Sequence, residues 1–398
     1  MAILSVLLAG FQAIGAGTPV VRVGLLSLGS VAKATVSSSE AFAAFDPESQ
    51  AQIGAWAGGS AVAVTAKGAV VEVGGKTFGR LYFSSKGPIL DVKGTVSRPY
   101  RGWIHVSAEA GKLVLVNEAP LDTYLMGVVP CEMSASAPEE ALKAQAIVSR
   151  SYVITKIDKW ATSKYDVDDS VNCQVYRGAQ YEKEASTKAV RDTAGLLLTY
   201  QGKVVNAIFG ANSGGMTEPA HEVWGGAPYS YLGAVLDTDP QGKPYAENSK
   251  HFLWTASFTA SQVESALSAA KKSVGAPLDI RIEQRSSTGR AARVLIYGSS
   301  GTVSVAGSEL RKYLGYDKLW STWFNVVKEG GGWRFDGRGW GHGVGMCQDG
   351  AVGRAKAGQS FRQILAAYYP GTSVALVRGE PLQLSTRGSV VNRRKFSG

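Results

Sequence analysis

The sequence predicts an α+β fold, in which a mixed, strand-rich body carries a motif-bearing helix and an inserted, smaller α/β region. Three observations support this prediction. Short β-branched runs fill the first third of the chain, helical spacing appears at 136–157, and helix and hairpin patterns alternate at 258–330. The hydrophobic share of 45% and the charged share of 19% are typical of a folded protein, and the 48 glycines show no collagen period.

Charge and cysteine content limit the function classes. Lys and Arg exceed Asp and Glu by 42 to 32, a net charge of +10, which suits nucleic acid, anionic lipid or an anionic wall polymer. No nucleic-acid motif, basic helix or zinc finger accompanies this charge, so we expect no nucleic-acid partner. Three cysteines without a Cys-x-x-Cys pair exclude a disulfide framework and a ribbon-type zinc site.

The first seventeen residues are apolar, rich in small residues and uncharged. They resemble the core and cleavage end of a secretory signal without its basic start, or alternatively a buried N-terminal strand or helix. We take residues 1–19 as a signal or anchor segment. This predicts an extracytoplasmic location, in the cell wall or periplasm, with membrane contact only through this segment. After residue 20 no apolar run is long enough to span a membrane.

Short strands separated by turn residues are predicted between Val20 and Val116. The predicted strands are VVRVGLL (20–26), SAVAVTA (60–66), AVVEVGG (69–75), GRLYFSS (79–85) and GKLVLVN (111–117). The first of these could also form a buried edge of the main sheet. The small-residue-rich stretch 34–60 is interpreted as an insertion or a mobile connection.

A helix is predicted over 136–157. Pro138 lies near its first position, and Glu139 and Glu140 follow in the first turn, where acidic side chains favour the positive end of the helix dipole. Leu142, Ala146, Ser149 and Val153 then recur at helical spacing.

The remaining elements alternate helix and strand. A second helix is predicted near 182–194, followed by a hairpin over 195–209 whose strands are joined by Gln201-Gly202. Residues 258–273 are predicted to be helical, 281–298 to form a hairpin and 307–315 to begin another helix.

These elements predict a division into domains. A catalytic body would comprise 20–250 and 331–380, with an inserted α/β subdomain at 251–330. The basic tail 381–398 is a solvated end or, alternatively, a contact with wall or membrane.

Glu132 is the first candidate for chemistry. It follows the apolar run LMGVVP and Cys131, directly before the predicted helix. On the shoulder of an apolar strand a carboxylate would be desolvated, which raises its pKa and keeps it available as a general acid. The alternative is that Glu132 caps or faces the start of the following helix.

Two Gly-rich segments are further candidates. Glycines alternate with other residues at 339–345, around His342, so the backbone can approach a ligand closely or bend sharply. A tight structural turn with His342 in a satisfied hydrogen bond is the alternative, and no phosphate loop follows. In ANSGGMTE (211–218), Ser213 and Thr217 could bind sugar hydroxyls or close the turn.

Four motifs in order, GVVPCEM with PEEALKAQAIVSRSY, NCQVYRG, NSGGMTE and GRGWGHGVGMCQDGA with ILAAYYPGT, resemble the stage II sporulation protein D family of peptidoglycan lytic transglycosylases. That family also includes amidase enhancers of the cell wall. The resemblance covers roughly residues 90–372, and the four motifs together are far more specific than any one of them.

The resemblance implies that Glu132 is the catalytic acid, acting on peptidoglycan glycan strands already stripped of stem peptides. It would cleave the bond between N-acetylmuramic acid and N-acetylglucosamine to leave a 1,6-anhydro sugar. One motif carboxylate suffices because the nucleophile belongs to the substrate, unlike in two-carboxylate hydrolases. The alternative is a non-catalytic wall-binding protein that recruits or stimulates a cell-wall amidase.

The resemblance also implies a set of substrate-binding residues. The turn residues would line the glycan groove, the Gly-rich motif would contact sugar or hold the site together, and the end of the motif helix would offer a cation to the muramoyl carboxylate. These candidates are Ser213, Gly214, Gly215, Thr217, His342, Gln348, Arg150 and Tyr152.

Two positions depart from the family pattern. Some members bind zinc through a His-Cys pair, but here Asn172 precedes Cys173 and no second Cys lies nearby, so we expect no metal and no other cofactor. Asp349 stands where members usually carry an aromatic residue. Cys131 and Cys347 flank the two main motifs, and their pairing as a disulfide or persistence as thiols is left open.

Overall fold

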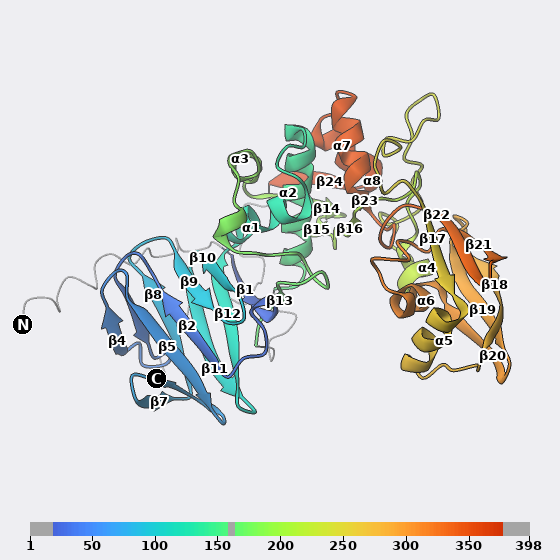
Figure 1. The fold of residues 1–398 in the computed structure, drawn as a ribbon. Coiled ribbons are helices and arrows are strands. Elements are labelled where there is room, and N and C mark those ends of the chain that lie inside the picture. The colour runs from blue at the N-terminus through green and yellow to red at the C-terminus, as the bar shows by residue number, and fades with distance from the viewer. Residues whose placement is uncertain (1–18, 158–163, 377–398) are drawn as a thin grey trace, which may run out of the picture. The chain divides into compact units, whose positions relative to one another are not determined.

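The computed structural model describes residues 19–157 and 164–376 and confirms the α+β class (Figure 1). Its described residues form two compact units. Unit 1 comprises those of Met1–Ser136 and Ser149–Leu197 together with Leu376, and unit 2 comprises Ala137–Val148 and Leu198–Ala375. The predicted signal or anchor segment and the basic tail lie outside the described residues, apart from Pro19. Among the described residues no helix is both long and apolar enough to cross a membrane.

Two sheets make up most of unit 1. The seven-stranded sheet has the order β13-β1-β12-β11-β8-β3-β4, formed by β1 (Val20–Gly24), β3 (Phe42–Phe45), β4 (Gln52–Trp56), β8 (Arg80–Ser85), β11 (Trp103–Glu109), β12 (Lys112–Pro120) and β13 (Val167–Asp168). The six-stranded sheet has the order β10-β9-β2-β5-β6-β7, formed by β2 (Lys33–Ser37), β5 (Ala61–Lys67), β6 (Val70–Val73), β7 (Lys76–Phe78), β9 (Leu90–Lys93) and β10 (Ser97–Tyr100).

The core of unit 1 lies where these sheets meet. β11 contacts β5 and β6, and β12 contacts β2 and β5. Alternation along β5 buries Val62, Val64 and Ala66 while Ala61 and Lys67 are exposed, as expected for a strand with one face on a core. All five strands predicted between Val20 and Val116 are confirmed, and β1 is buried inside the sheet between β12 and β13.

The prediction of an insertion or mobile connection at 34–60 was wrong, because this stretch supplies β2, β3 and β4. All four residues of β3 are buried, and the rings of Phe42 and Trp56 stack with centroids 5.4 Å apart. β3 pairs with β4 inside this stretch, but β3 also pairs with β8, and β2 pairs with β5 and β9, so local composition could not reveal the sheet that these strands join.

Unit 1 also contains helices, the first of which continues directly from a strand. α1 (Leu121–Glu132) begins where β12 ends, and α2 (Glu139–Ile154) and α3 (Glu184–Asp192) confirm the two predicted helices. α2 supplies residues to both units. Two short 3₁₀ turns occur at Leu26–Leu28 and Ala179–Tyr181.

The reading of LMGVVP as a strand was wrong, since it lies within α1. Leu121, Tyr124, Leu125, Val128 and Val129 are buried along α1. Their spacing follows one face of a helix, which becomes visible only when the period is read from Leu121 onward.

Four further small sheets lie wholly or mostly in unit 2. β14 (Leu196–Tyr200) lies between β15 (Lys203–Val204) and β24 (Ser373–Leu376), and β16 (Phe209–Gly210) pairs in parallel with β23 (Met346–Cys347). The others have the order β17-β22-β21, from β17 (Leu253–Thr259), β21 (Phe324–Glu329) and β22 (Gly332–Arg338), and β18-β19-β20, from β18 (Pro277–Arg285), β19 (Ala291–Gly298) and β20 (Gly301–Ala306). The helices are α4 (Ala220–Trp224), α5 (Ala260–Ala269), α6 (Gly307–Leu314), α7 (Gln348–Lys356) and α8 (Phe361–Tyr368).

The elements predicted for 258–330 are confirmed as α5, the β18–β19 hairpin and α6. They share one hydrophobic core, in which Val263 and Leu267 of α5 and Leu310 of α6 are buried with Phe324 and Phe335 of the neighbouring sheet. The boundaries proposed for a separate inserted subdomain stay a prediction.

Candidate functional site

Glu132 is the last residue of α1 and is half-buried. Its carboxylate oxygen Oε1 accepts a hydrogen bond of 2.6 Å from the backbone N–H of Val175, in the NCQVYRG motif. The carboxylate is therefore held by a second segment of unit 1. The following helix begins seven residues later, at Glu139.

Two tyrosines lie close to Glu132. Tyr124 is buried, and its hydroxyl donates to Oε1 of Gln174 at 3.3 Å. Burial raises the pKa of Tyr124 and of Tyr152, and the nearby charge of Glu132 raises both further. The two phenols therefore stay protonated at neutral pH, which lets them donate hydrogen bonds beside the carboxylate. Of the candidates, Tyr152 lies near enough to Glu132 for the carboxylate charge to raise the pKa of its hydroxyl.

The cysteines of unit 1 are unreactive thiols in this setting. Burial raises the pKa of Cys131 to about 11 and also raises that of Cys173, so neither is poised as a thiolate at neutral pH. All three cysteines of the chain, Cys347 included, are free. Within 19–157 and 164–376 no group of three or more His, Cys, Asp or Glu side chains is placed to hold a metal ion.

Arg150 holds unit 1 together and does not present its charge to a ligand. Its side chain is buried, with an ion pair from Nε to Asp122 at 2.9 Å and a hydrogen bond from Nη2 to the carbonyl of Val190 at 3.0 Å. Nη1 donates to the carbonyl of Leu196 at 3.3 Å. We therefore correct the expected substrate contact of Arg150 to a structural one, since a guanidinium committed to carbonyls of α3 and β14 cannot also face a groove.

The NSGGMTE turn in unit 2 is held by hydrogen bonds between backbone groups and the side chains of Asn212 and Thr217. Gly214 and Gly215 have φ angles of +73° and +103°, which favour glycine. The N–H of Gly214 donates to Oδ1 of Asn212 at 2.8 Å. Thr217 is fully buried, and its hydroxyl donates to the carbonyl of Gly233 and accepts from the N–H of Val235. Of the two roles left open for Thr217, the geometry supports closing the turn.

Cys347 joins this turn to the Gly-rich motif. Its buried Sγ accepts hydrogen bonds of 3.2 Å from the N–H groups of Ser213 and Gly350, the second of which caps α7. Asn212 and Trp340 exchange backbone hydrogen bonds of 2.9 and 3.0 Å beside it. Ser213 is 2% exposed, so its side chain faces the protein interior.

His342 is an uncharged part of the Gly-rich motif. Its Nδ1 accepts a 3.0 Å hydrogen bond from the N–H of Val344, which places the ring proton on Nε2. Burial is the main cause that lowers the pKa of His342 to about 4, and a hydrogen bond to the backbone of Phe209 opposes this shift. Of the two roles left open for the Gly-rich motif, this geometry supports a tight structural turn in which His342 is hydrogen-bonded.

The first turn of α7 carries the remaining motif residues. Nε2 of Gln348 donates to Oε1 of Gln145, in α2, at 3.2 Å. Asp349 accepts hydrogen bonds from Asn212 at 2.9 Å and from the hydroxyl of Ser249 at 2.6 Å. The carboxylate that departs from the family pattern is thus tied to the NSGGMTE turn.

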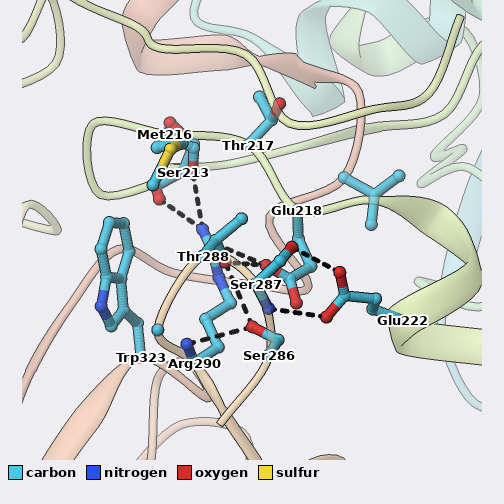
Figure 2. A network of polar contacts seen from close by, with 12 residues as sticks. Ser213, Met216, Thr217, Glu218, Glu222, Ser286, Ser287, Thr288, Arg290 and Trp323 are labelled. Atoms are coloured by element: carbon cyan, nitrogen blue, oxygen red, sulfur yellow. Dashed lines mark hydrogen bonds and ion pairs between the residues drawn. The ribbon is translucent and has the colours of Figure 1, made fainter.

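The sequence did not predict a buried ion pair in unit 2, formed by Arg290 and Glu218 (Figure 2). Arg290 pairs with Glu218 at 2.9 Å, both side chains being less than 5% exposed, and Nη2 donates to the carbonyls of Ser213 and Met216 at 2.7 Å. A Cβ on Gly343 would lie 2.7 Å from this Nη2, so the Gly-rich motif makes room for the guanidinium.

A signal for this pair existed in the sequence. Glu218 is a carboxylate in an otherwise uncharged Gly-rich motif, and buried carboxylates require a cationic or hydrogen-bonding partner. The identity of that partner could not be read, because Arg290 lies 72 residues away in the sequence.

The expected site residues thus fall into two groups. Glu132, Arg150 and Tyr152 belong to unit 1, and the remaining candidates belong to unit 2, namely Ser213, Gly214, Gly215, Thr217, His342 and Gln348. Within the second group, Ser213 donates its N–H to Cys347 and accepts at its carbonyl from Arg290.

Comparisons with known proteins agree with the motifs. A family model described as Stage II sporulation protein matches residues 109–200, and a domain of unknown function (DUF8618) matches 240–345. The chain is 34% identical over 289 residues to the amidase enhancer of Bacillus subtilis (strain 168), covering 63% of this chain but only 40% of that protein.

Two further relatives are covered over most of their length. The chain is 31% identical to stage II sporulation protein D of Bacillus amyloliquefaciens, covering 65% of this chain and 75% of the relative. The same identity holds for stage II sporulation protein D of Bacillus subtilis (strain 168), with 65% and 76% covered. From this coverage and the order of the motifs, the chain belongs to the stage II sporulation protein D family.

Proposed function

We propose that this protein is an exported lytic transglycosylase of peptidoglycan, with Glu132 as its catalytic acid and base. Family membership and similarity to an amidase enhancer indicate a cell-wall-related role. The observation that carries the finer proposal is the Glu132 carboxylate, which stands at the family's motif position, half-buried and oriented by the N–H of Val175. Protonated Tyr152, which is half-buried, adds a hydroxyl near the carboxylate that a polar substrate could contact.

The proposed reaction needs one carboxyl group. Glu132 donates its proton to the oxygen that links C1 of N-acetylmuramic acid to N-acetylglucosamine, and the C1–O bond breaks. The C6 hydroxyl of the same muramic sugar attacks C1, and the Glu132 carboxylate takes the hydroxyl proton. The products are a 1,6-anhydro end and a free N-acetylglucosamine hydroxyl, so no second carboxylate and no water are consumed.

The test compares Glu132→Gln with the wild type on peptide-stripped glycan strands and on intact peptidoglycan. We expect anhydro-sugar ends, detected by mass spectrometry, to fall at least about 100-fold in the variant, because loss of a general acid removes a factor of that order or more. Glu139→Gln is the matched control, since its side chain is half-exposed in the first turn of α2 and pairs with Lys143 on the same helix. Equal product from Glu132→Gln and wild type would contradict the assignment of Glu132.

The second candidate is a non-catalytic peptidoglycan-binding enhancer of a cell-wall amidase. It is favoured by the amidase enhancer among the relatives. Glycan binding by the wild type without anhydro ends, together with faster release of peptides when a purified cell-wall amidase is added, would support this candidate and reject the transglycosylase. The extracytoplasmic location belongs to both proposals and is checked by fractionating cells that express the full chain.

A further inference from the structure

A pocket of about 630 Å³ lies on unit 2, and its lining contains none of the site residues expected from the sequence. Strands β17, β21 and β22 form it, and the side chains used below are Arg338, Arg285, Asn325, Thr255, Asp336 and Leu253. A volume of this size is typical of small-molecule sites. Neither the proposed transglycosylase chemistry nor the family model for residues 109–200 assigns a role to it.

Arg338 brings an uncompensated positive charge to this pocket. Its guanidinium lies over the rings of Trp323 and Phe252, at 4.9 and 5.1 Å from their centroids, and it forms no ion pair within the described part of the chain. The aromatic rings hold the guanidinium in place through cation–π contacts without neutralising it.

Arg285 adds a second cation. Nη1 donates to the carbonyl of Gly289 at 2.6 Å, and Nη2 donates to Oδ1 of Asn325 at 2.7 Å. These neutral acceptors fix the side chain and leave its charge uncompensated by any described carboxylate. Asp336 is the one carboxylate of the lining, and it already pairs with Arg334 at 3.1 Å and accepts from Thr255 at 2.9 Å. The pocket is therefore net positive.

The backbone around Arg338 is firmly positioned. Its N–H donates to the carbonyl of Trp323 at 2.9 Å, and its carbonyl accepts from the hydroxyl of Ser321 at 2.7 Å. A Cβ on Gly214 would lie 3.0 Å from Cγ of Arg338, so the NSGGMTE turn packs directly behind this wall. The site is thus built before any ligand arrives, which lowers the entropy lost on binding.

We propose that this pocket binds a carboxylate-bearing saccharide, with the carboxylate paired to the Arg338 guanidinium. A planar guanidinium matches a carboxylate through two parallel hydrogen bonds. Asn325, Thr255 and Asp336 offer amide, hydroxyl and carboxylate groups to sugar hydroxyls, and exposed Leu253 offers an apolar contact at the rim. A mostly neutral sugar with one charge fits this mixture better than a polyphosphate, which Asp336 would repel. The site is a binding site separate from the chemistry of Glu132.

The test uses a matched ligand pair, the methyl glycosides of N-acetylmuramic acid and N-acetylglucosamine, which differ by the carboxylate-bearing lactyl group. Binding to the full chain is measured by ligand-detected NMR titration at low salt. We expect the muramic sugar to bind at least about ten-fold more tightly, because hydrogen bonds between charged partners have that effect on affinity. Neither ligand contains the bond that Glu132 would cleave, so failure of the transglycosylase proposal leaves this result unaffected.

Arg338→Gln should lower the affinity for the muramic sugar to that for the N-acetylglucosamine glycoside. Arg281→Gln should leave both affinities unchanged. Arg281 is the matched control because it lies in the same unit with a side chain 68% exposed, outside the pocket lining. Converting the lactyl carboxylate to an amide should remove the same ten-fold preference with wild-type protein, which keeps the test valid if Arg338→Gln fails to fold. Equal affinity for the two sugars, an unchanged preference in folded Arg338→Gln, or equal competition by glycerol phosphate polymer would overturn the proposal.

Discussion

At the residue scale, the Gly-rich motif depends on a histidine that is neutral in the folded protein. His342 accepts from Val344 through Nδ1, so protonation of that nitrogen would break the hydrogen bond as well as bury a charge. The pKa of about 4, against an ordinary value near 6.5, expresses this cost. His342 is therefore not suited to act as a catalytic base that titrates near neutral pH.

We predict that His342 makes unfolding easier as the solution becomes acidic. Between pH 6.5 and 4 the unfolded chain binds a proton at this position and the folded chain does not, so the free energy of unfolding falls as pH falls. The stability is fully present above pH 6.5. With a pKa of about 4 in the folded protein, the free energy of unfolding falls by about 2 kcal/mol between pH 7 and pH 5.

The measurement is urea unfolding at pH 7 and pH 5 for the wild type and His342→Asn. The Asn side chain can still accept a hydrogen bond from the N–H of Val344, but it does not titrate. The free energy of unfolding of the variant should therefore fall by about 2 kcal/mol less than that of the wild type between pH 7 and pH 5. His221→Asn, in α4, is the matched control. The same pH dependence in His342→Asn as in the wild type would show that His342 is not the source.

At the element scale, turns were easier to predict than partners. The hairpin at Gln201-Gly202 is confirmed, with φ angles of +49° and +73°, because a two-residue loop of this kind is dictated by local backbone preferences. By contrast, the parallel pairing of β16 with β23 joins segments over 130 residues apart. Hydrophobic periodicity does not report such long-range contacts, which is why the sheet that 34–60 joins through β2 was not predicted.

The alternating glycines are not equivalent, and we predict that Gly345 is the most demanding. It has a φ angle of +71°, and a Cβ there would lie 1.9 Å from the carbonyl oxygen of Ile208. Gly345→Ala should therefore lower the free energy of unfolding by about 4 kcal/mol, as expected when backbone strain and a core clash combine.

Gly358 provides the control for this prediction. Its φ angle is +85°, but a Cβ there would meet no atom within 4 Å. Gly358→Ala should lose only the conformational cost of about 1–2 kcal/mol. Equal losses in the two variants, measured by urea unfolding, would show that the Ile208 contact relaxes freely.

At the scale of the whole molecule, the net charge of +10 is a property of the surface and not of the fold. If the partner is an anionic wall polymer, binding of the full chain to purified cell walls should weaken about ten-fold or more between roughly 0.1 and 1 M NaCl. The Debye length falls from about 10 to about 3 Å over that range. Sedimentation with walls measures this effect, and uncharged chitin serves as the control polymer. Salt-independent binding to walls would assign recognition to neutral sugar contacts instead.

The sequence by itself determined the α+β class, the helix at 139–154, the local hairpins and the family, because these depend on spacing and residue type within short windows. It also located Glu132 and the two Gly-rich segments. Only the tertiary structure decided what surrounds them. It placed the N–H of Val175 on Glu132, turned Arg150 inward to Asp122, and buried Arg290 against Glu218. Burial and long-range hydrogen bonds arise from chain segments distant in sequence, and they decide whether a charged side chain supports the fold or meets a ligand.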